Sequence, residues 1–218
     1  SSIIMKEYFN YYKSIFCILV LLGVVFIVPG QIHAFQIEES FFMQDISEHW
    51  AEQSITDLTY MGVLKGDGEN ANPDKRVTRA EFMAMLVRAL GYKIDDVKTN
   101  VSFTDVKPGH WYYETVAIAR DKGIVKGNPD GTFLPNKPIS REEIVLVLVR
   151  TMDLQGENTE DASNFEDIKN SYPYKEQIDA AVSSGIISGY EDNTFRPNNY
   201  ASRAEAAIMI SRVLNRED

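Results

Sequence analysis

The chain has 218 residues and a formal net charge of −10, with 32 acidic and 22 basic side chains. An acidic balance of this size gives no general attraction to nucleic acid or to an anionic membrane surface, so we expect neither as a partner. The single cysteine, Cys17, provides no disulfide framework. The fold must therefore depend on core packing, for which the length is sufficient.

The segment 1–34 has the pattern of a secretory signal peptide. Two lysines precede an apolar run at positions 15–28, and Ala34 is a small residue at a cleavage position. The run is short for a membrane span, so an uncleaved anchor is the less favoured alternative. Met5 is the expected start, with positions 1–4 upstream of it. Cleavage after Ala34 removes two lysines and one glutamate, which leaves 20 basic and 31 acidic side chains, a net charge of −11, and no cysteine.

A short motif recurs three times at a constant interval: a hydroxyl residue, an arginine directly after it, and a glutamate three places after the hydroxyl. This is the capping-box pattern, in which the hydroxyl and the glutamate each bond the other's backbone N–H at a helix start. We therefore predict three helices with capping residues Thr78 and Glu81, Ser140 and Glu143, and Ser202 and Glu205.

The arginine of each motif occupies the first helical position, where the helix dipole disfavours a cation by about 0.3–1 kcal/mol. Three arginines in this position indicate a role other than helix formation. One interpretation is an anion site, since free N–H groups at a helix start and a planar guanidinium both suit a carboxylate or phosphate. The other is an arginine that bridges to an acidic residue of a neighbouring repeat. The residues alone leave both open.

The rest of the unit repeats as well. Each copy opens with an acidic residue before an aliphatic one, and a first helix with a buried stripe then ends at a glycine. A second glycine and a proline lie in the polar loop that follows. In chain order, these positions are Asp45, Asp105 and Asp167; Gly62, Gly123 and Gly185; Gly66, Gly127 and Gly189; and Pro73, Pro135 and Pro197.

The second helix of the middle copy contains six consecutive aliphatic residues, 144–149, which in isolation favour a strand. The register of the unit places this run where the other copies have helical spacing, so we predict a helix. Because it is apolar all round, we expect it to be the most buried of the three. Two-helix units this small cannot bury their own apolar faces, so the three must pack together and leave grooves between neighbours.

The ordered motifs, in three copies, resemble a tandem of S-layer homology (SLH) domains over about residues 43–215. The resemblance implies a mostly α fold, with three two-helix SLH repeats packed with pseudo-threefold symmetry around a central helical bundle. We place the repeats at residues 41–92, 101–153 and 163–215, after the signal peptide at 1–34. The resemblance also implies non-covalent anchoring of an exported protein to the bacterial cell wall or S-layer. The implied ligand is a pyruvylated secondary cell wall polysaccharide, bound in the inter-repeat grooves.

Carried over onto this sequence, the resemblance implies Arg79, Arg141 and Arg203 as receptors of the ketal carboxylate. The two tryptophans would stack on a sugar or, alternatively, serve as core residues at a helix entry. The loop glycines would let the backbone approach the ligand or, alternatively, only form turns. The aspartates would orient the arginine or accept sugar hydroxyls. These further candidates are Trp50, Trp111, Gly66, Gly127, Gly189, Asp45, Asp105 and Asp167.

The copies differ, so we expect unequal sites. Glu142 stands next to Arg141 and would repel an anion, and the third copy has no tryptophan. No nucleophile–base arrangement, phosphate loop or zinc spacing is present, and we expect neither enzymatic activity nor a cofactor. The loop at Asn128–Gly131 suggests calcium, but the EF-hand spacing is missing. The alternative function is a structural S-layer or protein–protein interaction module without glycan binding, whose partner is another surface protein.

Overall fold

The computed structural model describes residues 43–94, 103–154 and 164–216, and the predicted signal peptide lies outside them. No strand forms within these ranges, and none of their helices is long and apolar enough to cross a membrane. The prediction of a mostly α fold is therefore confirmed. The elements are the 3-10 helix η2 (Gln44–Ile46) and the helices α2 (Glu52–Tyr60), α3 (Arg79–Ala89), α4 (Tyr113–Asp121), α5 (Arg141–Thr151), α6 (Lys175–Ser183) and α7 (Arg203–Leu214).

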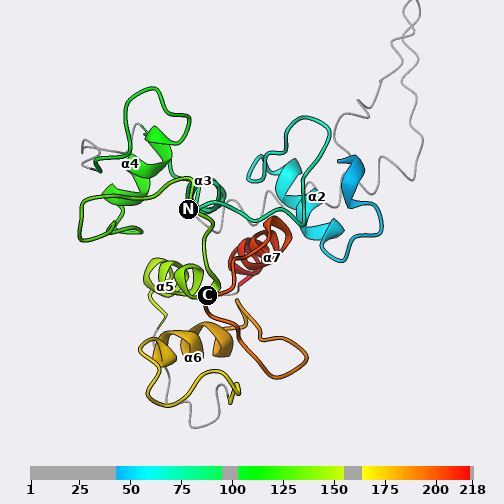
Figure 1. Ribbon diagram of the computed structural model, residues 1–218. Helices are drawn as coiled ribbons and strands as arrows, with labels where there is room; N and C mark the ends of the chain where they lie inside the picture. Colours follow the sequence, from blue (N-terminus) through cyan, green and yellow to red (C-terminus); the bar gives the residue numbers. More distant parts are fainter. Residues whose placement is uncertain (1–42, 95–102, 155–163, 217–218) are drawn as a thin grey trace, which may run out of the picture. The chain divides into compact units, whose positions relative to one another are not determined.

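The first helix of each repeat packs on the second helix of the repeat before it. Helix α4 contacts α3, and α6 contacts α5. The series closes because α2, in the first repeat, contacts α7 in the last (Figure 1). Each small unit thus buries its apolar stripe against a neighbour rather than against itself. This cyclic exchange confirms the predicted pseudo-threefold packing of three two-helix repeats.

Three equivalent residues join the repeats directly through their backbones. The N–H of Val77 donates to the carbonyl of Ala201, the N–H of Ala201 to Ile139, and the N–H of Ile139 to Val77, each over 3.0 Å. All three residues are fully buried. A buried, unpaired backbone group costs about 1–3 kcal/mol, so each repeat supplies a partner that the next one needs.

The predicted helix ends are present in the structure. Thr78 Oγ1 accepts from the Glu81 N–H over 3.2 Å, while the Glu81 carboxylate accepts from the Thr78 N–H over 2.8 Å. Helices α5 and α7 begin with the same reciprocal pair. The first helices end at glycines with positive φ, as expected of a left-handed cap. These are Gly62, Gly123 and Gly185, with φ of 71°, 71° and 75°.

The aliphatic run of the middle repeat forms α5, as the register predicted, but the expectation that it is the most buried second helix is wrong. Eight residues of α3 and seven of α7 are buried, against five of α5. Leu146 and Val149 stay partly exposed. Leu146 has the register position of Ile208, which lines an open groove in the third repeat. The outer face of a second helix is therefore left uncovered even where its sequence is apolar.

Candidate functional site

Each motif arginine reaches into the next repeat and pairs with the glutamate of its capping box. Arg79 Nη1 lies 2.8 Å from Glu143 Oε1. The observed contacts thus match the second interpretation of the sequence, in which the arginine bridges to an acidic residue of a neighbouring repeat. The three ion pairs close into a ring, as the backbone bonds do. The other two are Arg141–Glu205 at 3.5 Å and Arg203–Glu81 at 3.4 Å.

A loop residue of the next repeat is held between this arginine and the motif aspartate. Arg79 Nε donates to the carbonyl of Phe133 over 2.8 Å, and the N–H of Phe133 donates to Asp105 over 2.8 Å. The other Asp105 oxygen accepts from the N–H of Leu134. The aspartate therefore acts on the arginine through the loop backbone. The equivalent sets are Arg141, Phe195 and Asp167, and Arg203, Ala71 and Asp45.

The backbone N–H groups at the start of the second helices are occupied. In α5, the N–H of Arg141 donates to the carbonyl of Asn199 over 2.9 Å, and that of Glu142 to Pro197 over 3.0 Å. The third N–H is held by the capping box. Helices α3 and α7 begin in the same way. The expectation of free N–H groups for an anion is therefore wrong, because the next repeat's loop caps each helix.

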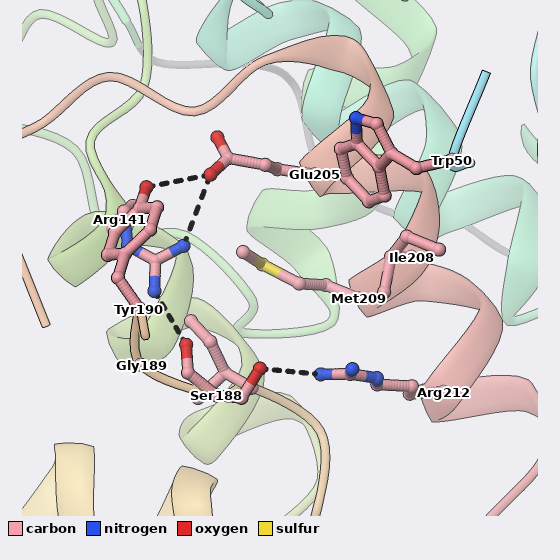
Figure 2. Close-up of a pocket in the computed structure, with 10 residues that line it drawn as sticks. Trp50, Arg141, Ser188, Gly189, Tyr190, Glu205, Ile208, Met209 and Arg212 are labelled. Atoms are coloured by element: carbon pink, nitrogen blue, oxygen red, sulfur yellow. Dashed lines mark hydrogen bonds and ion pairs between the residues drawn. The ribbon is translucent and has the colours of Figure 1, made fainter. Parts of the chain in front are cut away.

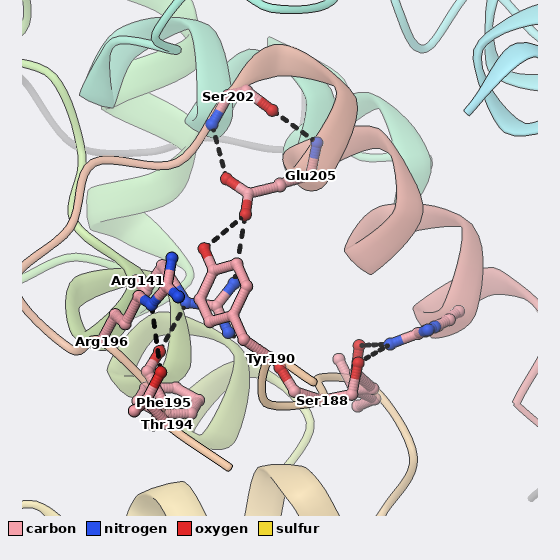
Figure 3. A network of polar contacts seen from close by, with 10 residues as sticks. Arg141, Ser188, Tyr190, Thr194, Phe195, Arg196, Ser202 and Glu205 are labelled. Carbon is pink, nitrogen blue, oxygen red and sulfur yellow. Dashed lines mark hydrogen bonds and ion pairs between the residues drawn. The ribbon is translucent and has the colours of Figure 1, made fainter. Parts of the chain in front are cut away.

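Arg141 is enclosed, with 4% of its surface exposed. Its Nε donates to Phe195 and its Nη2 to Ser188, both backbone carbonyls, over 2.9 and 2.8 Å (Figure 3). The rings of Tyr190 and Phe195 lie 4.6 and 4.8 Å from its guanidinium carbon. Burial lowers the pKa of Arg141, and Tyr190 and Glu205 act against this. The side chain still remains charged at physiological pH.

Tyr190 completes this network, and the sequence analysis missed it. Its hydroxyl donates to Glu205 Oε1 over 2.8 Å. Burial first, and then this hydrogen bond, raise the pKa of Tyr190, so the phenol stays protonated as a donor. The same loop position holds Asp67 in the first repeat and Asn128 in the second, each with the equivalent backbone bond. Because the three repeats carry different residues at this position, a comparison of their sequences does not single out Tyr190.

An open groove of about 140 Å³ lies beside this network, and we call it the α7 groove (Figure 2). All three repeats contribute to its lining. The first repeat supplies Trp50, the second supplies Arg141, and the third supplies most of the wall. The third-repeat lining includes Ile187, Tyr190, Glu205, Ile208, Met209 and Arg212.

The two tryptophans are exposed, not core residues. Trp50 is 65% exposed and Trp111 is 60% exposed. Trp50 lines the α7 groove, and its ring centroid lies 5.3 Å from that of His49. His49 itself accepts from the Ala51 N–H at the helix entry. Core packing therefore does not explain either tryptophan, and stacking on a sugar stays a prediction.

A second set of three arginines, with the same interval as the first, was missed although the spacing in the sequence could have revealed it. These arginines lie in the last turn of each second helix. Each Nη1 donates to the carbonyl that follows the helix-ending glycine of its own repeat. The set is Arg88 to Val63, Arg150 to Ile124 and Arg212 to Ile186, over 3.3, 2.9 and 3.4 Å.

The loop glycines have a packing reason to be glycine. A Cβ on Gly127 would lie 2.2 Å from the ring of Phe103, and one on Gly189 would lie 2.1 Å from that of Phe165. At Gly66 the nearest atom is a backbone oxygen at 2.1 Å. Gly189 also lines the α7 groove. Close packing thus accounts for these residues, and an approach of the backbone to a ligand stays a prediction.

Two further acidic residues singled out in the sequence, Glu142 and Asp130, accept hydrogen bonds from nearby side chains. Glu142 accepts a hydrogen bond from the hydroxyl of Tyr172. Burial and this carboxylate raise the pKa of Tyr172 well above its usual range. In the loop that suggested calcium, the Asp130 carboxylate accepts from both the N–H and the hydroxyl of Thr132. Within the described ranges, no three His, Cys, Asp or Glu side chains are grouped to hold a metal.

The sequence matches the S-layer homology domain family at residues 44–83, 102–145 and 164–207. It is 33% identical to a surface-layer 125 kDa protein of Lysinibacillus sphaericus, over 78% of this chain and 14% of that protein. It is 34% identical to an amylopullulanase of Thermoanaerobacterium thermosulfurigenes, over 86% of this chain and 10% of the relative. A cellulosome-anchoring protein of Acetivibrio thermocellus is 31% identical, over 76% of this chain and 40% of that protein. The chain spans between 10% and 40% of the length of these relatives. Three matched segments, one in each repeat of the ring, show that the chain belongs to the S-layer homology domain family.

Proposed function

We propose that the three repeats hold an exported protein on the bacterial cell wall without a covalent bond. The ligand in this proposal is an anionic, pyruvylated secondary cell wall polysaccharide, bound in the grooves between repeats. The family and its surface-layer and anchoring relatives support a location at the cell surface. Some relatives are enzymes, but the chain covers 10% of the amylopullulanase. We therefore propose anchoring rather than catalysis for this chain.

The observation that carries the proposal is the lining of the α7 groove. An exposed indole, Trp50, stands in the same groove as three apolar side chains and two arginines; the apolar residues are Ile187, Ile208 and Met209. A sugar ring has an apolar face that suits the indole, and a ketal-linked pyruvate adds a carboxylate that suits a guanidinium. A groove with both features fits an acidic saccharide better than a neutral one.

The motif arginines have a defined place in this proposal. Arg141 lines the groove, and by register Arg79 and Arg203 stand at the equivalent positions of the other two inter-repeat junctions. Each donates to a loop carbonyl of the next repeat, so in this proposal each shapes the junction between repeats. Loss of any of them is expected to weaken binding, and its effect on folding must be measured alongside.

The test is sedimentation of the expected mature protein, beginning at Phe35, with purified cell walls before and after mild acid removal of pyruvate. Arg79→Ala, Arg141→Ala and Arg203→Ala accompany it, each checked for folding by circular dichroism. Binding that disappears with the ketal and weakens in at least one folded variant supports the proposal. Binding that is indifferent to both changes contradicts it and favours a protein–protein interaction module. Sheets that form without walls would favour the same alternative.

A further inference from the structure

We infer that Arg212, and not Arg141, makes the direct contact with the acidic group of a ligand in the α7 groove. Trp50 of the first repeat is its stacking partner, so the ligand connects the first and third repeats. The inference rests on the proposed function and specifies how one groove performs it.

The contacts and the burial of Arg141 make it a poor direct partner for a ligand. Each of its three guanidinium nitrogens already faces a protein oxygen, on Phe195, Ser188 and Glu205. Only 4% of its surface is exposed, so little of the guanidinium is open to a ligand. A ligand that displaced the bond to Phe195 would leave the carbonyl of a buried residue without this donor. Arg141 is therefore a positioning residue that holds the groove wall.

Arg212 has the opposite character. It is exposed, and its Nη1 lies 3.4 Å from the Ser188 hydroxyl (Figure 2). The same nitrogen lies 3.4 Å from the Ile186 carbonyl. These distances are at the long end of hydrogen bonding. Within the described ranges, its Nε and Nη2 make no hydrogen bond to the protein. A guanidinium with two free nitrogens can bind a carboxylate through both oxygens.

The charge of the groove depends on the same residue. Among the lining residues, the charged side chains are Arg141, Glu205 and Arg212. The first two form an ion pair with each other, which leaves the positive charge of Arg212 without a counter-ion in the lining. The chain as a whole carries a net charge of −10, so attraction of an acidic ligand must come from a local cation of this kind.

The equivalent arginines provide internal controls. Arg150 is exposed in the same register on α5. In the repeat whose helix α6 packs there, Pro173, just before that helix, takes the register position of the tryptophan. Arg88, on the helix α3 that α4 contacts, is only partly exposed, and burial lowers its pKa. The α7 groove thus combines an exposed arginine with an exposed indole.

The experiment uses polysaccharide released from the walls, with its pyruvate intact or removed by mild acid. The protein carries Trp111→Phe, so that Trp50 fluorescence reports on the α7 groove. We expect Arg212→Gln to weaken binding of the intact polysaccharide at least about tenfold, and Arg212→Lys to weaken it less. Arg150→Gln is the matched control and should bind as the parent does.

Side-chain nitrogen NMR of the parent protein gives a readout that does not depend on any substitution. On titration with intact polysaccharide, the Nε–H signal of Arg212 should shift while that of Arg141 stays in place. A shift of Arg141 alone, or unchanged affinity of Arg212→Gln for the intact polysaccharide, overturns the inference and leaves the proposed function standing. If the parent binds neither polysaccharide, the proposed function itself fails.

Discussion

Arg79 Nη1 lies 2.8 Å from Glu143 Oε1, so the glutamate that caps α5 is also the counter-ion of the arginine that begins α3. An arginine at the first helical position is unfavourable with respect to its own helix dipole. The carboxylate from the next repeat offsets this cost. One short motif thus both starts a helix and attaches it to the neighbouring repeat, and three copies make the attachment cyclic.

Arg141→Ala should lower the free energy of unfolding by about 3 kcal/mol or more, because it leaves the carbonyls of Phe195, a buried residue, and Ser188 without this donor and Glu205 without its cation. Urea denaturation followed by circular dichroism measures the change. Lys107→Ala, at an exposed loop position, is the control and should change little. A loss below about 1 kcal/mol for Arg141→Ala would contradict the inter-repeat role.

Asp105→Asn should cost about 1–3 kcal/mol of stability, since an amide has one acceptor oxygen where the carboxylate uses two. The two bonds hold Phe133 and Leu134, and Leu134 has the unfavourable positive φ of 58°. Thermal unfolding of the variant, compared with the exposed Glu114→Gln, measures the effect. Equal melting temperatures for the two variants would show that the loop does not need the two Asp105 hydrogen bonds.

Gly127→Ala should destabilise the protein more than Gly123→Ala, by about 1–3 kcal/mol. Both glycines have positive φ, 78° and 71°, so both substitutions carry the backbone strain of an L-residue. Only at Gly127 would the added Cβ meet a ring, that of Phe103 at 2.2 Å, whereas nothing lies within 4 Å at Gly123. Urea unfolding of the two variants checks this order, and equal losses would mean that the ring moves without cost.

Asp192 should titrate with a pKa of about 2, below its ordinary value of 3.8, because Thr194 and Arg196 donate to its carboxylate. Since the folded-state pKa is depressed, the stabilising contribution is present above pH 3.8 and is lost as the pH falls toward 2. Carbon-13 NMR of the carboxyl group measures the midpoint. Thr194→Val should move it back toward 3.8, and a wild-type midpoint near 3.8 would refute the contact.

A chain that ends at residue 154 should lose cooperative unfolding, because the third repeat closes the ring onto the first. Its removal takes away the α7 surface under α2, the carbonyl of Ala201 that Val77 needs, and the Arg203 that pairs with Glu81. Denaturant titration of the shortened chain checks this. A sharp transition with reduced amplitude would instead indicate linearly stacked repeats, each stable on its neighbour.

The sequence by itself determined the elements whose causes are local. The capping pairs, such as Thr78 with Glu81, are close in the chain, and a helix-ending glycine such as Gly62 acts on its own turn. Comparison of the repeats added what one segment could not supply: the strand-like run 144–149 was assigned to a helix by its register alone. The three-repeat fold followed because units this small must share their apolar faces.

Only the tertiary structure decided what each side chain of the site meets. The Arg203 guanidinium binds the carbonyl of Lys65, 138 residues away, and the Arg141 bond to Phe195 spans 54 residues. Patterns with the period of a helix carry no information about such partners. The enclosure of Arg141, the exposure of Trp50 and the place of Tyr190 in the groove depend on which repeat packs beside which. That packing order follows from the closed ring, in which the first and last repeats satisfy each other's buried backbone groups.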